Sequence, residues 1–240
     1  MNRMRGCVRG RRKPERGRRS MQDKVRIKIC GLRTEEDIRY VNHAMPDYAG
    51  FILARGRARS ITPEKMKSLA GSLKPDILRT AVFADQDMEY IAQLAQLEFI
   101  DVIQLHGHES QEQILALKSC TKKPVVKAFS IRGPEDVLRA QESFADMILL
   151  DHGKGGSGEK FDWSLLRKID RPFFLAGGLS AENVQEAIRL TDPFAVDVSS
   201  SVETDGKKDP AKISAFAQAV RDAGAGGQTE EERGGLNNGR

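Results

Sequence analysis

The chain has 240 residues, of which 39% are hydrophobic, 30% charged and 6% aromatic, so it can bury a large aliphatic core as one domain. No apolar run approaches the roughly 18 residues that cross a bilayer, and three cysteines are too few for a disulfide framework and are typical of a reducing cytoplasm. The formal net charge of +5 is unevenly distributed, so it does not by itself indicate nucleic-acid binding.

The two ends of the chain differ in composition from its middle. Residues 1–22 carry nine Lys or Arg against Glu15, a charge of +8, whereas residues 223–240 carry −1 and residues 23–222 carry −2. Residues 1–22 have too little apolar surface to offset the entropy lost on ordering, and the segments AGAGG and ERGGLNNG in 223–240 are typical of a flexible end. We therefore expect a disordered basic arm at 1–22, one folded domain at 23–222 and a flexible tail at 223–240.

The basic arm has two interpretations. Met21 stands directly before the first apolar run, which favours Met21 as the true start and residues 1–20 as a translation artefact. The alternative is an arm that binds a polyanion through its arginines. For the folded domain we expect neither a nucleic-acid partner nor a membrane partner.

Eight short β-branched runs alternate with amphipathic segments along the folded domain. The runs are 25–30, 48–53, 78–83, 100–105, 124–129, 146–151, 172–178 and 193–199. The amphipathic segments are 34–44, 63–73, 87–97, 111–119, 134–144, 162–169, 181–190 and 210–220. Thr34 and Ser180 are predicted N-caps. Such alternation predicts an α/β fold with a parallel sheet, and eight units favour a closed (βα)8 TIM barrel over an open sheet.

Alternation within the strands predicts which side chains face the barrel interior. In the first strand the apolar Val25, Ile27 and Ile29 should face the helices, which turns Lys28 and Cys30 inward. The same reasoning places further pairs on the interior face: Gln104 and His106, Val125 and Lys127, and Asp197 and Ser199. A buried lysine needs a partner, so we expect an ion pair between Lys28 and Asp197.

Two residues that end predicted strands are candidates for acid–base chemistry, because barrel active sites gather at the carboxyl ends of the strands. Cys30, in KICGL, is either a core cysteine or a reactive thiol whose pKa must be lowered for it to act as a base. Asp151, in LLDHGKGGSG, either caps a turn or is a general acid. The glycine-rich residues 155–158 that follow suit a mobile lid.

Three loops carry the signals of anion binding. LAGGLS (175–180) and DVSSSVE (197–203) follow the last two strands, where this fold usually binds phosphate. Arg55, Arg57 and Arg59 follow the second strand and either form a solvated basic loop or hold a carboxylate. The four histidines lack ligand spacing, so no metal is expected. Together these features predict isomerisation, by proton transfer, of a phosphorylated small molecule that carries a carboxylate.

Six motifs agree in order and spacing with one enzyme family. They are KICG, GFIL followed by R-x-R-S-I, VIQLHG, LLD followed by GGSG-x-x-FDW, GGL, and AVDVSS. Over residues 23–222 the sequence resembles the phosphoribosylanthranilate isomerases of tryptophan biosynthesis. The resemblance implies the Amadori rearrangement of N-(5-phosphoribosyl)anthranilate to 1-(2-carboxyphenylamino)-1-deoxyribulose 5-phosphate. It also implies no cofactor, a cytoplasmic location and a monomer or homodimer.

The resemblance also implies roles for individual residues. Asp151 protonates the ribose ring oxygen and Cys30 removes the C2 proton, while Arg59, with Arg57 as the alternative, holds the anthranilate carboxylate. The residues that bind the phosphate are Gly177, Gly178, Ser199 and Ser200. Ser201 stands where the family usually has glycine, which predicts either a strained backbone or an additional hydroxyl donor.

Three rival functions make different demands on the sequence. The histidine-pathway isomerase that performs the same type of rearrangement has an aspartate at the end of the first strand, where this chain has Cys30. Indole-glycerol phosphate synthase needs a catalytic lysine and an additional N-terminal helix, which residues 1–22 cannot form. A barrel that binds RNA through its arm, without catalysis, is the rival from another class.

Overall fold

A computed structural model describes residues 24–151 and 163–225. The predicted arm at 1–22 and the predicted lid at 155–158 lie outside these residues. Within them, no helix is both long and apolar enough to span a membrane.

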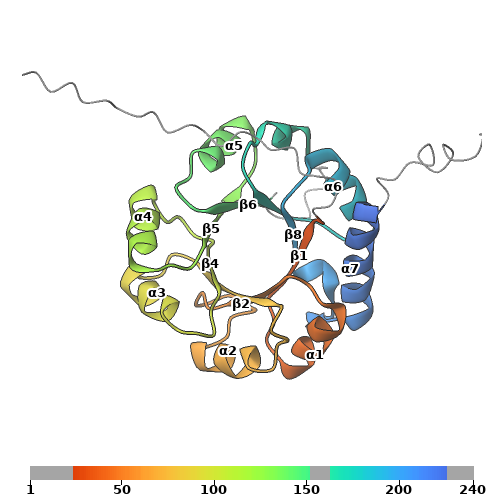
Figure 1. Ribbon diagram of the computed structural model, residues 1–240, viewed down its shortest axis with the longest axis horizontal. Coiled ribbons are helices and arrows are strands. Elements are labelled where there is room, and N and C mark those ends of the chain that lie inside the picture. The colour runs from red at the N-terminus through yellow and green to blue at the C-terminus, as the bar shows by residue number, and fades with distance from the viewer. Residues whose placement is uncertain (1–23, 152–162, 226–240) are drawn as a thin grey trace, which may run out of the picture.

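Eight parallel strands form a closed barrel in which each strand pairs with its neighbours in chain order and β8 pairs with β1 (Figure 1). This confirms the predicted fold class. The strands are β1 (Arg26–Cys30), β2 (Tyr48–Ile52), β3 (Leu78–Phe83), β4 (Val102–Leu105), β5 (Val125–Ser130), β6 (Met147–Asp151), β7 (Phe173–Ala176) and β8 (Ala195–Val198).

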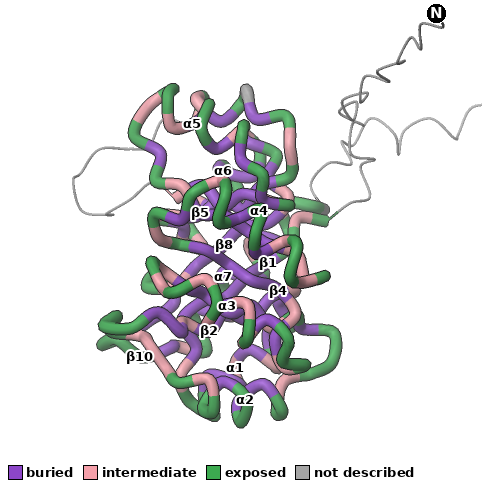
Figure 2. The backbone as a smooth tube through the Cα atoms, turned by 90° about the vertical axis from the view of Figure 1, so that its left-hand side faces the viewer, coloured by how far each residue is buried: buried purple, intermediate pink, exposed green. Residues whose placement is uncertain are grey.

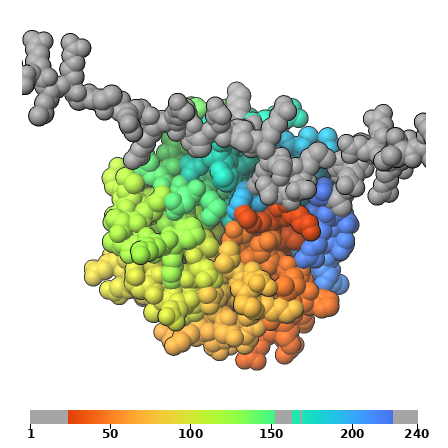
Figure 3. Space-filling view, in the orientation of Figure 1, coloured from red at the N-terminus to blue at the C-terminus, as the bar shows by residue number. Residues whose placement is uncertain are grey.

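Helices form a ring around the barrel (Figure 1). They are α1 (Glu35–Ala44), α2 (Pro63–Ala70), α3 (Met88–Ala95), α4 (Gln111–Cys120), α5 (Pro134–Gln141), the 3-10 helix η1 (Trp163–Lys168), α6 (Val184–Thr191) and α7 (Pro210–Ala225). After β8 the chain forms the short 3-10 helix η2 (Ser200–Val202) and a hairpin of β9 (Glu203–Thr204) and β10 (Lys207–Lys208). In the space-filling view, the red and blue ends of the barrel lie side by side where the ring closes (Figure 3).

The core has two layers, and the buried residues follow the strands through the centre of the molecule (Figure 2). The larger layer, which includes Ile27 and Ile29, lies between the strands and the helices. The smaller layer fills the barrel interior with Tyr48, Val102, Val126, Ala128, Leu149, Phe174, Ala176 and Ala195. The predicted inward orientation of Lys28 and Cys30 follows from these layers, because Ile27 and Ile29 take the opposite face.

The prediction for β5 was wrong. Val126 and Ala128 belong to the interior layer and Val125 to the outer one, so Lys127 shares the helix side with Val125. Its ammonium is 3.0 Å from a carboxylate oxygen of Glu109, which follows β4, and both side chains are buried. When a strand is buried on both faces, both sets of alternating residues contain apolar side chains. The sequence alone therefore could not show which set faces the barrel interior.

Helix starts were predicted correctly in one of two cases. Thr34 is the N-cap of α1 and forms a capping box with Asp37. Ser180 is not an N-cap, because α6 begins at Val184 with Asn183 at the capping position. The side-chain oxygen of Asn183 accepts from the Ser180 amide at 2.9 Å, which stabilises a turn before the helix. At the other end, α7 continues through Ala225, so the predicted flexible tail cannot begin at 223.

Three aspartates fix the strand register at the amino end of the barrel. Asp47, Asp101 and Asp146 each directly precede an even-numbered strand, β2, β4 or β6. Their carboxylates accept backbone amides of β1, β3 and β5 at 2.7, 2.8 and 2.9 Å. Each carboxylate therefore ties an odd strand to the next even one, and this register determines which side chains meet at the carboxyl ends.

Candidate active site

Cys30 ends β1 and is buried. Lys28, two residues earlier on the same strand, is also buried and faces the barrel interior with it. The Lys28 ammonium is 2.9 Å from Asp197 Oδ1 on β8, which confirms the predicted ion pair, and its positive charge acts on the Cys30 thiol. The thiol thus lies beside a buried cation that a carboxylate already neutralises.

A glycine on the neighbouring strand makes room for the thiol. Gly50 of β2 is in register with Cys30, and a Cβ added to Gly50 would lie 2.7 Å from Sγ and 3.0 Å from the Cys30 Cα. A Cβ atom essentially never makes a non-bonded contact as short as 2.7 Å, so a larger residue at position 50 would displace the thiol. Gly50 is part of the GFIL motif, and its proximity to Cys30 explains why glycine is needed there.

Burial raises the pKa of the Cys30 thiol, Lys28 opposes that increase and Asp197 adds to it. The thiol form therefore predominates at neutral pH, and any thiolate depends on Lys28.

We expect Cys30 to titrate above the usual cysteine pKa of about 8.5. The measurement is the pH dependence of iodoacetamide alkylation, followed by mass spectrometry, in a Cys7→Ser/Cys120→Ser variant. Lys28→Met should move the midpoint further upward, because it removes the cation and leaves Asp197. The neutral pair Lys28→Met/Asp197→Asn is the control for loss of the buried charge. A midpoint below 8.5 in the parent would contradict this account.

Asp151 ends β6, which β7 and β8 separate from β1 around the barrel (Figure 1). It is in register with the interior residue Ala176, so its side chain shares the face that carries Cys30. That side chain is 31% exposed, and Oδ2 is 3.8 Å from His106 Nε2. The two proton-transfer candidates therefore approach the barrel mouth from two different, non-adjacent strands.

His106 follows β4 and was predicted to face inward without an assigned role. Burial, together with the positive charge of Lys28, lowers the pKa of His106, so its imidazole is neutral at neutral pH. The amide nitrogen of Gln104 lies 3.1 Å from Nδ1. Since that nitrogen can only donate, Nδ1 accepts and Nε2 carries the proton that faces Asp151.

Of the three arginines after β2, Arg59 has its side chain beside Gly31, the residue that follows Cys30. Arg55 and Arg57 are exposed, whereas Arg59 is intermediate in exposure. A Cβ added to Gly31, the residue after Cys30, would lie 2.7 Å from Arg59 Cδ. Gly31 has φ +82°, a conformation that also favours glycine. The missing side chain at 31 thus lets Arg59 pass directly over the end of β1.

The two predicted phosphate loops lie after neighbouring strands, β7 and β8. Gly177 and Gly178 have φ of 87° and 65°, which turn the backbone sharply at the end of β7. Ser199 donates its hydroxyl to the Cys30 carbonyl at 3.1 Å, and Ser200 begins η2. This bond joins the β8 loop directly to the strand that carries the thiol.

Ser201 lies within η2 and is not among the described non-glycine residues with positive φ. Serine therefore adopts this backbone without strain, and its exposed side chain is free of that cost. Of the two alternatives that the sequence left open, the strained backbone is wrong.

Two charged residues of the site had no role in the sequence prediction. Glu203 accepts from Arg59 Nε at 2.8 Å and from Nη2 at 2.7 Å, and Lys208 donates to Glu203 at 2.8 Å. Glu203 ends the quoted motif DVSSSVE, but nothing local in the sequence links it to an arginine 144 positions earlier.

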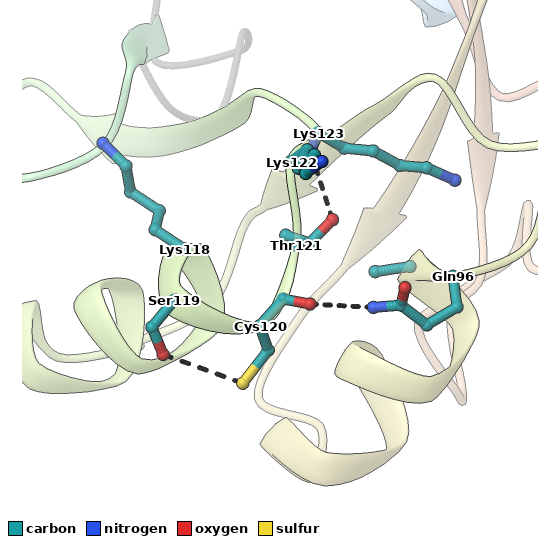
Figure 4. A pocket seen from close by; sticks show the side chains of 8 residues that line it. Gln96, Lys118, Ser119, Cys120, Thr121, Lys122 and Lys123 are labelled. Atoms are coloured by element: carbon teal, nitrogen blue, oxygen red, sulfur yellow. Dashed lines mark hydrogen bonds between the residues drawn. The ribbon is translucent and has the colours of Figure 1, made fainter.

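A hollow of about 450 Å³ lies between the ends of α3 and α4 (Figure 4). Gln96, Cys120 and three lysines line it, and it lies by the amino end of β5, away from the barrel mouth. Among the described residues, no group of three or more His, Cys, Asp or Glu could hold a metal ion.

Comparison with known proteins gives a consistent result. The family model described as N-(5'-phosphoribosyl)anthranilate (PRA) isomerase matches residues 27–219. The N-(5'-phosphoribosyl)anthranilate isomerase of Clostridium kluyveri is 40% identical over 199 residues, which are 82% of this chain and 98% of that protein.

Solved structures agree with the sequence matches. A phosphoribosylanthranilate isomerase in complex with reduced 1-(o-carboxyphenylamino)-1-deoxyribulose 5-phosphate has 35% identity and a TM-score of 0.73, covering 82% of this chain and 99% of the other. Monomers generated from the dimeric isomerase of Thermotoga maritima have 36% identity and a TM-score of 0.73 over the same shares.

Proposed function

The chain belongs to the N-(5'-phosphoribosyl)anthranilate isomerase family and is an isomerase of tryptophan biosynthesis, and we propose that Asp151 and Cys30 are its general acid and general base. The observation that carries this proposal is their placement on one interior face at the carboxyl ends of β6 and β1. A protonated Asp151 donates to the ribose ring oxygen, the bond from that oxygen to C1 breaks, and the nitrogen lone pair forms the Schiff-base cation.

Cys30 performs the second proton transfer. Its thiolate takes the proton from C2, and the electrons of that bond form the C1–C2 double bond of the enolamine while the cation is neutralised. Tautomerisation then gives the 2-keto product. Lys28 supports this step, since it is the positive charge next to the sulfur and favours the thiolate. No cofactor takes part in this scheme.

The phosphate of the substrate is assigned to the loops after β7 and β8, through Gly177, Gly178, Ser199 and Ser200. Positive φ at the two glycines turns the backbone directly after β7, and this end of a TIM barrel commonly binds phosphate through backbone amides. The complex of the relative with a reduced 5-phosphate compound supports a phosphorylated small-molecule ligand for this chain.

The carboxylate of the anthranilate ring is assigned to Arg59 rather than Arg57. We expect Arg59→Ala to raise KM about tenfold or more with a smaller effect on kcat, because the lost contact is made equally in the ground state and the transition state. Initial-rate kinetics of the purified full chain measure both constants, with Arg57→Ala as the matched control. A loss confined to kcat would place Arg59 in transition-state binding instead.

The direct test of the proposed function uses the full chain and freshly made N-(5-phosphoribosyl)anthranilate. Conversion is followed as loss of substrate fluorescence, and the product is identified by mass spectrometry and its reduction by borohydride. Residues 21–240 form the second sample. Equal activity of the two samples would show that residues 1–20 are dispensable for the reaction, and loss of activity in the shorter one would show that they contribute to it.

The remaining expectations concern location and assembly. The two described cysteines, Cys30 and Cys120, are both free thiols, which supports a cytoplasmic, reducing environment. A monomer or homodimer is proposed, in line with the relative from Thermotoga maritima whose dimeric and monomeric forms are both named.

A further inference from the structure

The substrate-facing arginine of this site is held by a buried carboxylate. Arg59 places Nε and Nη2 on the two oxygens of Glu203, in the side-on geometry that fixes a guanidinium plane. The Glu203 side chain is only 4% exposed, whereas that of Arg59 is 30% exposed. Glu203 therefore holds the Nε–Nη2 edge of the guanidinium, and the Nη1–Nη2 edge remains for a ligand.

A second cation completes the anchor. Lys208 lies on β10, and its buried ammonium donates to Glu203 Oε1 and to the Ser199 carbonyl, both at 2.8 Å. The two cations hold the pKa of Glu203 at about 2, so the carboxylate is ionised at neutral pH. Arg59, Glu203 and Lys208 together carry a net charge of +1, and without Lys208 the group would be neutral.

The same hairpin ties together the loops after three strands. Lys208 fixes the backbone of Ser199, whose hydroxyl bonds the Cys30 carbonyl. Arg33, after β1, donates to the carbonyl of Ala58 in the β2 loop and to that of Gly206 in the hairpin. The carboxylate clamp and the β8 phosphate loop are thus joined through one short hairpin, residues 203–208.

We propose that Glu203 and Lys208 are positioning residues, which hold the Arg59 guanidinium at a fixed orientation and distance from the Ser199 loop so that the site accepts a ligand with one aromatic carboxylate and one phosphate. The proposal rests on the proposed role of Arg59. It makes the β9–β10 hairpin a determinant of substrate specificity rather than a connection between β8 and α7.

The first test is a double-mutant cycle on KM. Glu203→Gln should raise KM about tenfold and change kcat by less than about threefold, because the chemistry at Asp151 and Cys30 is untouched. In the Arg59→Ala background the same change should add little, since Glu203 acts through Arg59. Asp205→Asn, in the exposed turn of the same hairpin, is the matched control and should leave KM unchanged.

The second test separates the two ends of the ligand. Anthranilate and inorganic phosphate serve as competitive inhibitors of the full enzyme. Glu203→Gln should weaken inhibition by anthranilate about tenfold, the same loss as in KM, and leave that by phosphate within about twofold. Lys208→Met should weaken both, because it reduces the clamp charge and releases the Ser199 backbone, and it provides a second variant if Glu203→Gln does not fold.

The outcomes distinguish the role of Arg59 from the positioning role of Glu203 and Lys208. If Arg59→Ala leaves KM unchanged, the role of Arg59 is wrong and this proposal falls with it. If Arg59→Ala raises KM while Glu203→Gln and Lys208→Met do not, only the positioning role is overturned. Full additivity of Glu203→Gln and Arg59→Ala would overturn it as well.

Discussion

Replacing Asp151 by Asn should lower kcat by about 100-fold or more, the usual contribution of a positioned general acid. Asparagine keeps the shape of the side chain at the end of β6 and its position beside His106. It cannot release a proton to the ring oxygen, so ring opening loses its acid while the phosphate and carboxylate contacts remain. KM should therefore change much less than kcat.

The measurement is initial-rate kinetics with fluorescence detection, and Asp192→Asn is the matched control. Asp192 is exposed beyond the end of α6 and has φ 45°, which asparagine tolerates. A kcat for Asp151→Asn within about threefold of the parent value would show that Asp151 is not the general acid. His106, whose Nε2 lies 3.8 Å from Asp151 Oδ2, would then be the residue to test.

The sequence was informative wherever one face of a strand is apolar and the other is not. In β1, Lys28 and Cys30 alternate with isoleucines, so their inward orientation and the pairing with Asp197 could be predicted. In β5 both faces are apolar, and the inward prediction for Lys127 was wrong. Periodicity identifies a face only when the two faces differ in polarity.

The parts of the site that were missed depend on contacts between distant segments. Glu203 and Arg59 are separated by 144 residues, and their pairing follows from the closure of the barrel, which places the β8 hairpin beside the loop after β2. Gly50 and Cys30 meet because β1 and β2 are in register. Single-sequence patterns report local periodicity, whereas these contacts are set by register and closure.

Replacing Cys30 by Ala should also lower kcat by about 100-fold or more, with ligand binding retained, because alanine leaves no base within reach of C2. Cys30→Ser sharpens the test: serine is similar in size, but its hydroxyl is far less acidic than a thiol and gives no anion at neutral pH. Both variants should be inactive to a similar degree, and inhibition by inorganic phosphate should match that of the parent.

The exposed thiol Cys120, at the end of α4, provides the control, and Cys120→Ala should leave kcat unchanged. Activity of Cys30→Ser close to that of the parent would show that the position matters for packing and hydrogen bonding rather than for proton abstraction. Activity lost in Cys30→Ala but largely kept in Cys30→Ser would lead to the same conclusion. The sulfur is identified as the base only if both Cys30→Ala and Cys30→Ser lose activity while inhibition by phosphate is unchanged. The space beside Gly50 accommodates either small side chain, so a packing defect would not explain that result.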